Sequence, residues 1–185
     1  MKFKSIILCV ILASVVFSCE KEDDSNGNST TNPPDTTSTG DPSFECMIDG
    51  VAFDSHILLI AGAGGSSAGV TTRTASGTVF RSNGDTITVA ITATSFDADA
   101  FAVGTTFDAS NTLLGDYCFG NVNVNNGAVD IEASTEDTEM ANVTITQYDE
   151  STETWSGTFS FTAEDDDIGV TYVVTEGEFS LVEFD

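Results

Sequence analysis

An alternation of apolar and polar residues with a period of two runs through most of the chain after residue 43, and it constrains the fold more than any other feature. Its clearest stretch is residues 155–163, where Trp155, Phe159 and Phe161 alternate with serine and threonine. Successive side chains of a β-strand point to opposite faces, so this pattern predicts a strand with one buried face and one solvated face. No segment of ten residues in this part of the chain has a helical period. We therefore expect an all-β fold.

The same alternation recurs in further segments that are separated by turn signals. The segments are 44–53, 86–93, 118–125, 129–132 and 143–146. Turn signals include Asp49-Gly50 and Asn126-Gly127, which are typical of hairpins, and Glu176-Gly177. About ten short strands, each with one buried face, predict an antiparallel β-sandwich, with a flattened β-barrel as the alternative.

The first 18 residues have the organisation of a lipoprotein signal peptide. Two lysines precede an apolar run over residues 6–17, which is shorter than the ~20 residues of a membrane-spanning helix. The run ends in Val16-Phe17-Ser18-Cys19, which resembles the lipobox of bacterial lipoproteins. This resemblance implies cleavage before Cys19 and a lipid anchor on its thiol. Two or more acyl chains make such anchoring stable.

The composition changes again at residue 44. Residues 20–43 contain no aliphatic or aromatic side chain, so they cannot bury enough surface to offset the entropy of ordering. We therefore predict three parts: a signal peptide over 1–18, a lipidated disordered tether over 19–43, and a single β domain over 44–185.

The charge of the chain is strongly negative. It holds 30 acidic and five basic residues, for a formal net charge of −25. Nucleic-acid binding needs cations that neutralise phosphates, so we exclude a nucleic acid as a partner. An acidic surface also keeps a protein soluble, so the charge alone points to no particular ligand.

Several motifs resemble a family of uncharacterised lipoproteins from Bacteroidota. The lipobox, the acidic stretch after it, and the segments 44–50, 101–107, 157–163 and 177–180 carry the resemblance. It implies an all-β domain with no assigned function and no catalytic residues to carry over. The run after the lipidated cysteine resembles the acidic export signal of these lipoproteins; its residues are Glu20, Lys21, Glu22, Asp23 and Asp24. The resemblance implies the lipoprotein export machinery as a partner, and a place in the outer membrane facing the cell exterior.

Two cysteines remain once the signal peptide and the lipidated residue are set aside. Cys46 and Cys118 both share parity with the apolar face of their segments. Outside the reducing cytosol such a pair favours a disulfide, so we predict a Cys46–Cys118 bridge, with two buried thiols as the alternative.

Two short motifs resemble the O-glycosylation acceptor of Bacteroidota. They place the sugar on Thr36, in the tether, or on Thr86, in the β domain. We favour Thr36, because a modifying enzyme needs an accessible hydroxyl.

The residues give little support for catalysis or metal binding. His56 is the only histidine, and no nucleophile-elbow motif accompanies it. The glycine-rich segment 61–69 lacks the ending of a phosphate-binding loop, so we interpret it as a mobile loop. The acidic clusters 97–99 and 164–167 do not match a calcium loop, and we interpret them as solvated turns. We expect no metal site and no cofactor.

The sequence thus favours a membrane-anchored lipoprotein whose β domain binds a glycan or a protein without catalysis. Two alternatives stay open. One is a carboxylate-based hydrolase such as a glycosidase, which needs two carboxyl groups ~5–9.5 Å apart. The other is a purely structural envelope protein. The sequence does not decide whether the protein is an enzyme, although its lack of catalytic motifs argues against one.

Overall fold

The predicted all-β class is confirmed. The structure, a computed structural model, describes residues 40–53, 57–109, 115–136 and 138–184, which belong to one compact unit. They form an 11-stranded sheet and one short 3-10 helix, η1 (Ala98–Ala100). Within these residues no helix is long and apolar enough to cross a membrane.

Several strands are longer than the sequence pattern predicts. Their bounds are β1 (Ser43–Ile48), β2 (Val51–Ala52), β3 (Ile57–Ser67), β4 (Val70–Phe80), β5 (Thr86–Ser95), β6 (Thr106–Asp108), β7 (Tyr117–Asn125), β8 (Asp130–Ser134), β9 (Ala141–Asp149), β10 (Thr154–Asp165) and β11 (Val170–Glu183). The first strand, β1, begins at Ser43, one residue before the expected start of the domain at residue 44.

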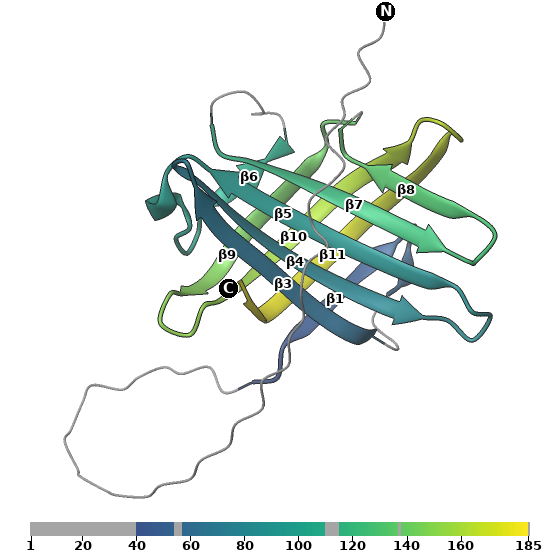
Figure 1. Cartoon of the computed structure of the whole chain (residues 1–185), viewed down its shortest axis with the longest axis horizontal. Helices are drawn as coiled ribbons and strands as arrows, with labels where there is room; N and C mark the ends of the chain where they lie inside the picture. The colour runs from purple at the N-terminus through teal and green to yellow at the C-terminus, as the bar shows by residue number, and fades with distance from the viewer. Residues whose placement is uncertain (1–39, 54–56, 110–114, 137, 185) are drawn as a thin grey trace, which may run out of the picture. The chain divides into compact units, whose positions relative to one another are not determined.

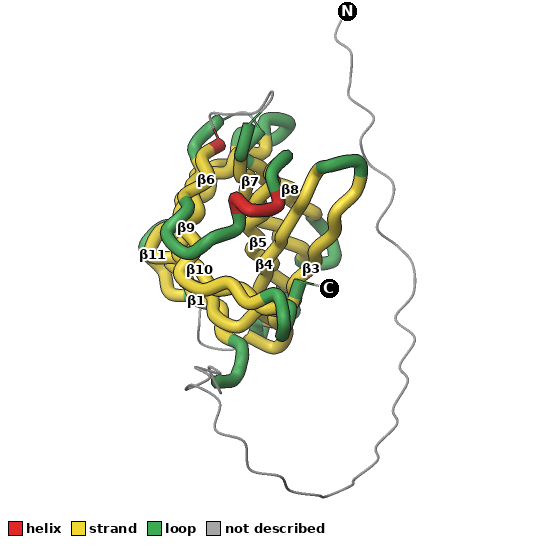
Figure 2. The backbone as a smooth tube through the Cα atoms, turned by 90° about the vertical axis from the view of Figure 1, so that its left-hand side faces the viewer, coloured by secondary structure: helices red, strands yellow, loops and turns green. Residues whose placement is uncertain are grey.

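The strands form one continuous hydrogen-bonded path in the order β2-β1-β11-β10-β9-β6-β7-β5-β4-β3, with β8 paired to β7 and β10. All pairings are antiparallel except a single parallel contact between β6 and β7. Figure 1 shows β3, β4, β5 and β7 side by side in front, with β9, β10 and β11 crossing behind them. Figure 2 shows the same two layers from the side. One mixed sheet therefore supplies both layers.

The predicted alternation fills the space between the layers. Trp155, Phe159 and Phe161 of β10 are all buried, and Phe44 and Phe179 pack against them from β1 and β11. The ring centroids of Trp155 and Phe179 lie 4.4 Å apart. Burying an aromatic side chain stabilises a fold by about 1.5–3 kcal/mol, so this row dominates the core.

The interpretation of residues 61–69 as a mobile loop is wrong. Residues 61–67 complete β3 and pair with β4 down to Ser67 and Val70, and only Ala68-Gly69 form the turn. The glycines serve packing: a Cβ on Gly62 would lie 1.8 Å from the Glu183 carbonyl oxygen, and one on Gly64 would lie 1.9 Å from that of Phe184. Small residues therefore allow the end of β11 to lie against β3.

The expected turn at Glu176-Gly177 is a strand irregularity instead. β11 continues through both residues, while Glu176 has a φ of 52° and the register with β10 shifts nearby. A Cβ on Gly177 would lie 2.6 Å from the Phe159 carbonyl oxygen. The glycine thus lets β11 bend closely over β10.

Candidate functional site

Most of the predicted site residues lie outside the described residues. These are Cys19, the acidic run 20–24 and Thr36; His56, to which the sequence assigns no role, also lies outside them. Thr86 is described: it begins β5, is half-buried, and pairs with Phe80 of β4 and Asn125 of β7. A modifying enzyme would therefore meet Thr86 within a paired strand.

The predicted disulfide is not formed. Cys46 and Cys118 are both buried, as their parity predicted, but no bond joins them. They lie on β1 and β7, which are separated by four strands in the sheet order, and the Cys118 thiol donates a hydrogen bond to the Phe107 carbonyl oxygen at 3.2 Å. Burial, and to a smaller extent the nearby Asp108 carboxylate, raise the pKa of Cys118 from 9.0 to about 12. Cys118 is thus a core thiol with little thiolate character.

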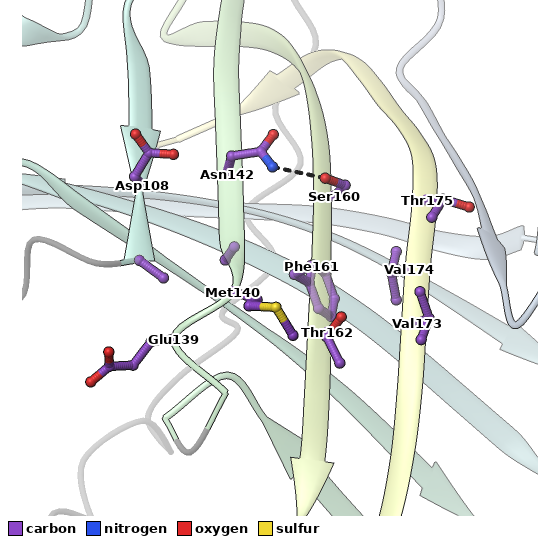
Figure 3. Close-up of a pocket in the computed structure, with 12 residues that line it drawn as sticks. Asp108, Glu139, Met140, Asn142, Ser160, Phe161, Thr162, Val173, Val174 and Thr175 are labelled. Atoms are coloured by element: carbon purple, nitrogen blue, oxygen red, sulfur yellow. Dashed lines mark hydrogen bonds between the residues drawn. The ribbon is translucent and has the colours of Figure 1, made fainter.

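A shallow groove crosses the outer face of β9, β10 and β11, and Figure 3 shows the part of it that is lined by Asp108 and Glu139. It consists of two adjoining depressions, of about 380 and 420 Å³, which share Asn142 and Ser160. The Asn142 side-chain nitrogen donates to the Ser160 hydroxyl at 2.8 Å. Met140 and Val173 expose apolar surface beside them.

Carboxylates line both ends of this groove. Asp108 and Glu139 line one depression, and Glu45, Glu176 and Glu178 line the other. Neither depression has a basic residue in its lining. The groove therefore suits a cation or a polyhydroxylated ligand rather than an anion. Among the described residues, no group of three or more histidine, cysteine or acidic side chains is placed to hold a metal ion.

The acidic clusters that the sequence singled out are engaged with backbone. Asp97 accepts a hydrogen bond from the Asp99 amide and caps η1. Asp165 accepts from the amides of Asp167 and Ile168, and also from that of Glu132. These carboxylates therefore shape turns.

Arg73 projects inward from β4 and lies among aromatic rings. Its guanidinium carbon is 4.1 Å from the ring centroid of Phe184, 5.4 Å from that of Phe101 and 5.9 Å from that of Tyr148. One terminal nitrogen donates to the Tyr148 hydroxyl at 2.9 Å, and the other donates to the Thr72 carbonyl oxygen. The buried Nε has no partner among the described residues. Cation–π contacts thus join β4 to β9 and to the end of β11.

Strands β3, β4, β5 and β7 also have a side that points away from the core. On that side, none of these four strands carries a charged residue. We call this surface the uncharged face. Its side chains are Leu59, Ala61, Ala63 and Gly65 on β3; Thr72, Thr74, Ser76, Thr78 and Phe80 on β4; Thr86, Thr88, Ala90, Thr92 and Thr94 on β5; and Tyr117, Phe119, Asn121, Asn123 and Asn125 on β7. On so acidic a chain, a neutral surface of this extent is distinctive.

Hydroxyl groups pair across the strands of this face. Hydrogen bonds join Thr74 to Thr92 at 2.9 Å, Thr78 to Thr88 at 2.9 Å, and Thr72 to Thr94 at 3.3 Å. Threonine is stiff at χ1, and cross-strand threonine pairs stabilise a sheet. The pairs therefore hold the hydroxyls in fixed positions.

Two aromatic rings lie at one end of the uncharged face. Tyr117 and Phe119 stack with ring centroids 6.5 Å apart and an interplanar angle of 25°. They are the strand partners of Thr94 and Thr92, which are both buried, whereas Phe119 remains 40% exposed. The rings thus stand on a rigid threonine base and present apolar surface to solvent.

Part of this arrangement could be predicted from the sequence. Tyr117 is one of three tyrosines, and the alternation of threonine in β5 indicated a polar outer face. The grouping of Tyr117 and Phe119 with two threonine pairs depends on the β5–β7 register, which joins residues more than 20 positions apart. No local pattern shows that pairing.

Fold and surface together define an all-β domain built from one mixed sheet, with a neutral hydroxyl-rich face and an acidic groove. Residues 66–183 match the domain of unknown function DUF6252, and the chain belongs to this family. This agrees with the expected family of domains without an assigned function. Comparisons with curated proteins and with solved structures give no significant match.

Proposed function

We propose that this protein is a lipoprotein, anchored in the outer membrane through Cys19 and facing the cell exterior, whose β domain binds a ligand without catalysis. The anchor and the address rest on the lipobox and on the acidic run after Cys19. Binding rests on the uncharged face, where Tyr117 and Phe119 stack on a fixed threonine base. Exposed aromatic side chains beside fixed polar groups are a common basis of recognition.

The anchor is tested by Cys19→Ser in the native host. We expect metabolic labelling with a fatty acid to mark the wild-type protein and to leave the variant unlabelled. The variant should also stay as a precursor or appear in the soluble fraction. Normal acylation of the variant would refute the anchor.

Surface display is tested separately by replacing Glu20, Glu22, Asp23 and Asp24 with alanine. Lipidation should be unchanged, because Cys19 and the residues before it are intact. Protease treatment of whole cells should cleave the wild-type domain and spare the variant. Equal cleavage, or equal protection, would show that the acidic run is not an export signal.

The acidic groove supports a second candidate, a carboxylate-based glycosidase. Asp108 and Glu139 both line one depression, so they are the candidates for a general acid and for its partner, a base or a nucleophile. Asp108→Asn and Glu139→Gln should each abolish hydrolysis of aryl glycosides, whereas Glu183→Gln, outside the groove, should not. Hydrolysis that survives both groove substitutions would exclude these residues as the catalytic pair.

A further inference from the structure

We infer that the ligand of the uncharged face is a neutral glycan, held across Tyr117 and Phe119. The inference rests on the proposed binding function and names the chemical class of its ligand. It follows from three properties of the face. The ring of Phe119 is exposed, two side-chain amides have no partner among the described residues, and the four strands carry no charged side chain, although Glu132 and Asp130 of β8 border them opposite Asn123 and Asn125.

The rings match the apolar side of a sugar. A pyranose ring presents C–H groups on its faces and hydroxyls around its edge. The faces of Phe119 and Tyr117 carry negative partial charge and attract such C–H groups. Because Phe119 is 40% exposed and its partner Thr92 is buried beneath the face, a sugar can stack on the ring without a change in the sheet.

Polar groups beside the rings remain available for hydroxyls. The side-chain amides of Asn121 and Asn123 follow Phe119 on the same face of β7, and neither hydrogen-bonds to another described residue. Each amide offers two donors and an acceptor. Since adjacent sugar hydroxyls need both kinds of partner, an asparagine next to a stacking ring suits them well.

The threonine pairs extend the polar surface along the strands. Thr88 and Thr78 lie beside Asn123, and their hydroxyls bond to each other at 2.9 Å. Each paired oxygen keeps an acceptor site for a further donor. From Thr94 to Thr86 the face runs for about 27 Å at the rise of an antiparallel strand. A surface of this length, without a closed pocket, suits a polymer rather than a single small molecule.

Charge selects among polymers. The chain carries a net charge of −25, whereas the uncharged face has no cation to neutralise an acidic ligand. Charges separated by less than the Debye length, about 8 Å at physiological salt, still repel one another. Glycans that carry carboxylate or sulfate groups are therefore disfavoured, and uncharged hexose or pentose polymers meet no such penalty.

The test is affinity electrophoresis of the full mature protein in a mild detergent, run through native gels that contain dextran, galactomannan, β-glucan or polygalacturonate. At least one uncharged polymer should retard the wild type, and polygalacturonate should not. Phe119→Ala should weaken the retardation about tenfold or more, because it removes a central aromatic contact. Phe119→Trp should preserve it.

A matched control is Ile168→Ala. Ile168 is a 54% exposed apolar residue in the turn between β10 and β11, outside the uncharged face, so its loss should leave retardation nearly unchanged. Urea unfolding of each variant checks that the fold is intact. If Phe119→Ala and Ile168→Ala behave alike, or if polygalacturonate binds as well as the neutral polymers, the inference is wrong.

The outcome also separates this inference from the proposed function. If no uncharged polymer binds, but a member of a synthetic peptide library binds in a manner that depends on Phe119, the face is a binding site and the glycan assignment fails. If neither polymers nor peptides bind, both the assignment and the binding function fail, and a structural role in the envelope remains.

Discussion

Gly62 lies on β3, an edge strand of the sheet, at the point where β3 contacts the end of β11. Gly62→Ala should disrupt that contact. A Cβ at residue 62 would lie 1.8 Å from the Glu183 carbonyl oxygen and 2.6 Å from a methyl carbon of Val182. Real Cβ contacts essentially never fall below 3.0 Å. The nearest obstacle is backbone, which no change of rotamer removes, so β3 and the end of β11 must move apart by more than about 1 Å.

The size of the effect follows from what this separation uncovers. Val182 and Phe184 are both buried at the end of β11, and Phe184 carries the closest ring contact of Arg73. Burial of each such side chain is worth about 1.5–3 kcal/mol, and forced overpacking costs about 1–3 kcal/mol. Partial loss of these contacts should lower the free energy of unfolding by about 3 kcal/mol.

Gly65→Ala is the matched control on the same strand. A Cβ at residue 65 would meet no atom within 4 Å, and its backbone is outside the left-handed region. Alanine there should be neutral or should stabilise by about 0.4–1 kcal/mol, because it restricts the unfolded chain. Urea titrations that follow the fluorescence of Trp155, the only tryptophan, give both free energies. Equal stability of the two variants would refute the close approach of β3 and β11.

Three further predictions concern polar groups. Tyr148→Phe should lower the free energy of unfolding by about 1–3 kcal/mol in urea titrations, because it leaves a guanidinium donor unpaired, whereas Tyr172→Phe should have a smaller effect; equal losses would contradict this. Cys118 should react with iodoacetamide in urea but not in the native protein below pH 9, because its pKa is raised to about 12. Its contribution to stability is present below pH 9 and is lost as the pH rises towards 12, since the unfolded thiol ionises first; rapid native alkylation, measured by mass spectrometry, would contradict this. Ser151→Ala should raise the pKa of Asp149 in an NMR titration, because the Ser151 hydroxyl is the largest cause of its lowered value; an unchanged pKa would exclude that bond.

The sequence was sufficient for the class of fold and for much of the core. Period-two alternation identifies the core side of β10, and Trp155, Phe159 and Phe161 are buried accordingly, whereas β5 is buried on both faces from Val89 to Ser95. The Asp49-Gly50 turn joins β1 and β2 as predicted, and both residues have positive φ. These features depend on local conformation, which a local pattern reports.

Features that depend on contacts between segments far apart in the sequence were not predictable in this way. The glycines of β3 suggested a loop because glycine weakens a strand, yet their small size is what the end of β11 requires. Both cysteines alternate in phase with the apolar residues of their strands. This pattern places two side chains on the inner side of the sheet, but it does not place them next to each other. Pairing of β7 with β5 likewise decided the composition of the uncharged face.

The acidic groove contains a like-charge pair whose cost can be measured. Glu45 and Glu178 are directly opposite each other on β1 and β11, and both are exposed. Facing like charges destabilise a strand pair by roughly 0.2–1 kcal/mol. Glu178→Gln should therefore raise the free energy of unfolding by about 0.5 kcal/mol at low salt, a gain that 1 M NaCl removes because the Debye length falls to about 3 Å.

Glu183→Gln is the control, since Glu183 faces Thr154 rather than a carboxylate and should show a smaller effect. Calcium adds a second comparison. If the pair only repels, CaCl₂ should shift the melting temperature no more than NaCl of equal ionic strength, before and after Glu178→Gln. A calcium-specific shift that a chelator reverses, and that Glu178→Gln abolishes, would refute simple repulsion. The stabilisation expected of Glu178→Gln would mean that the groove keeps its carboxylates at a cost to the fold, as sites that act on a ligand do.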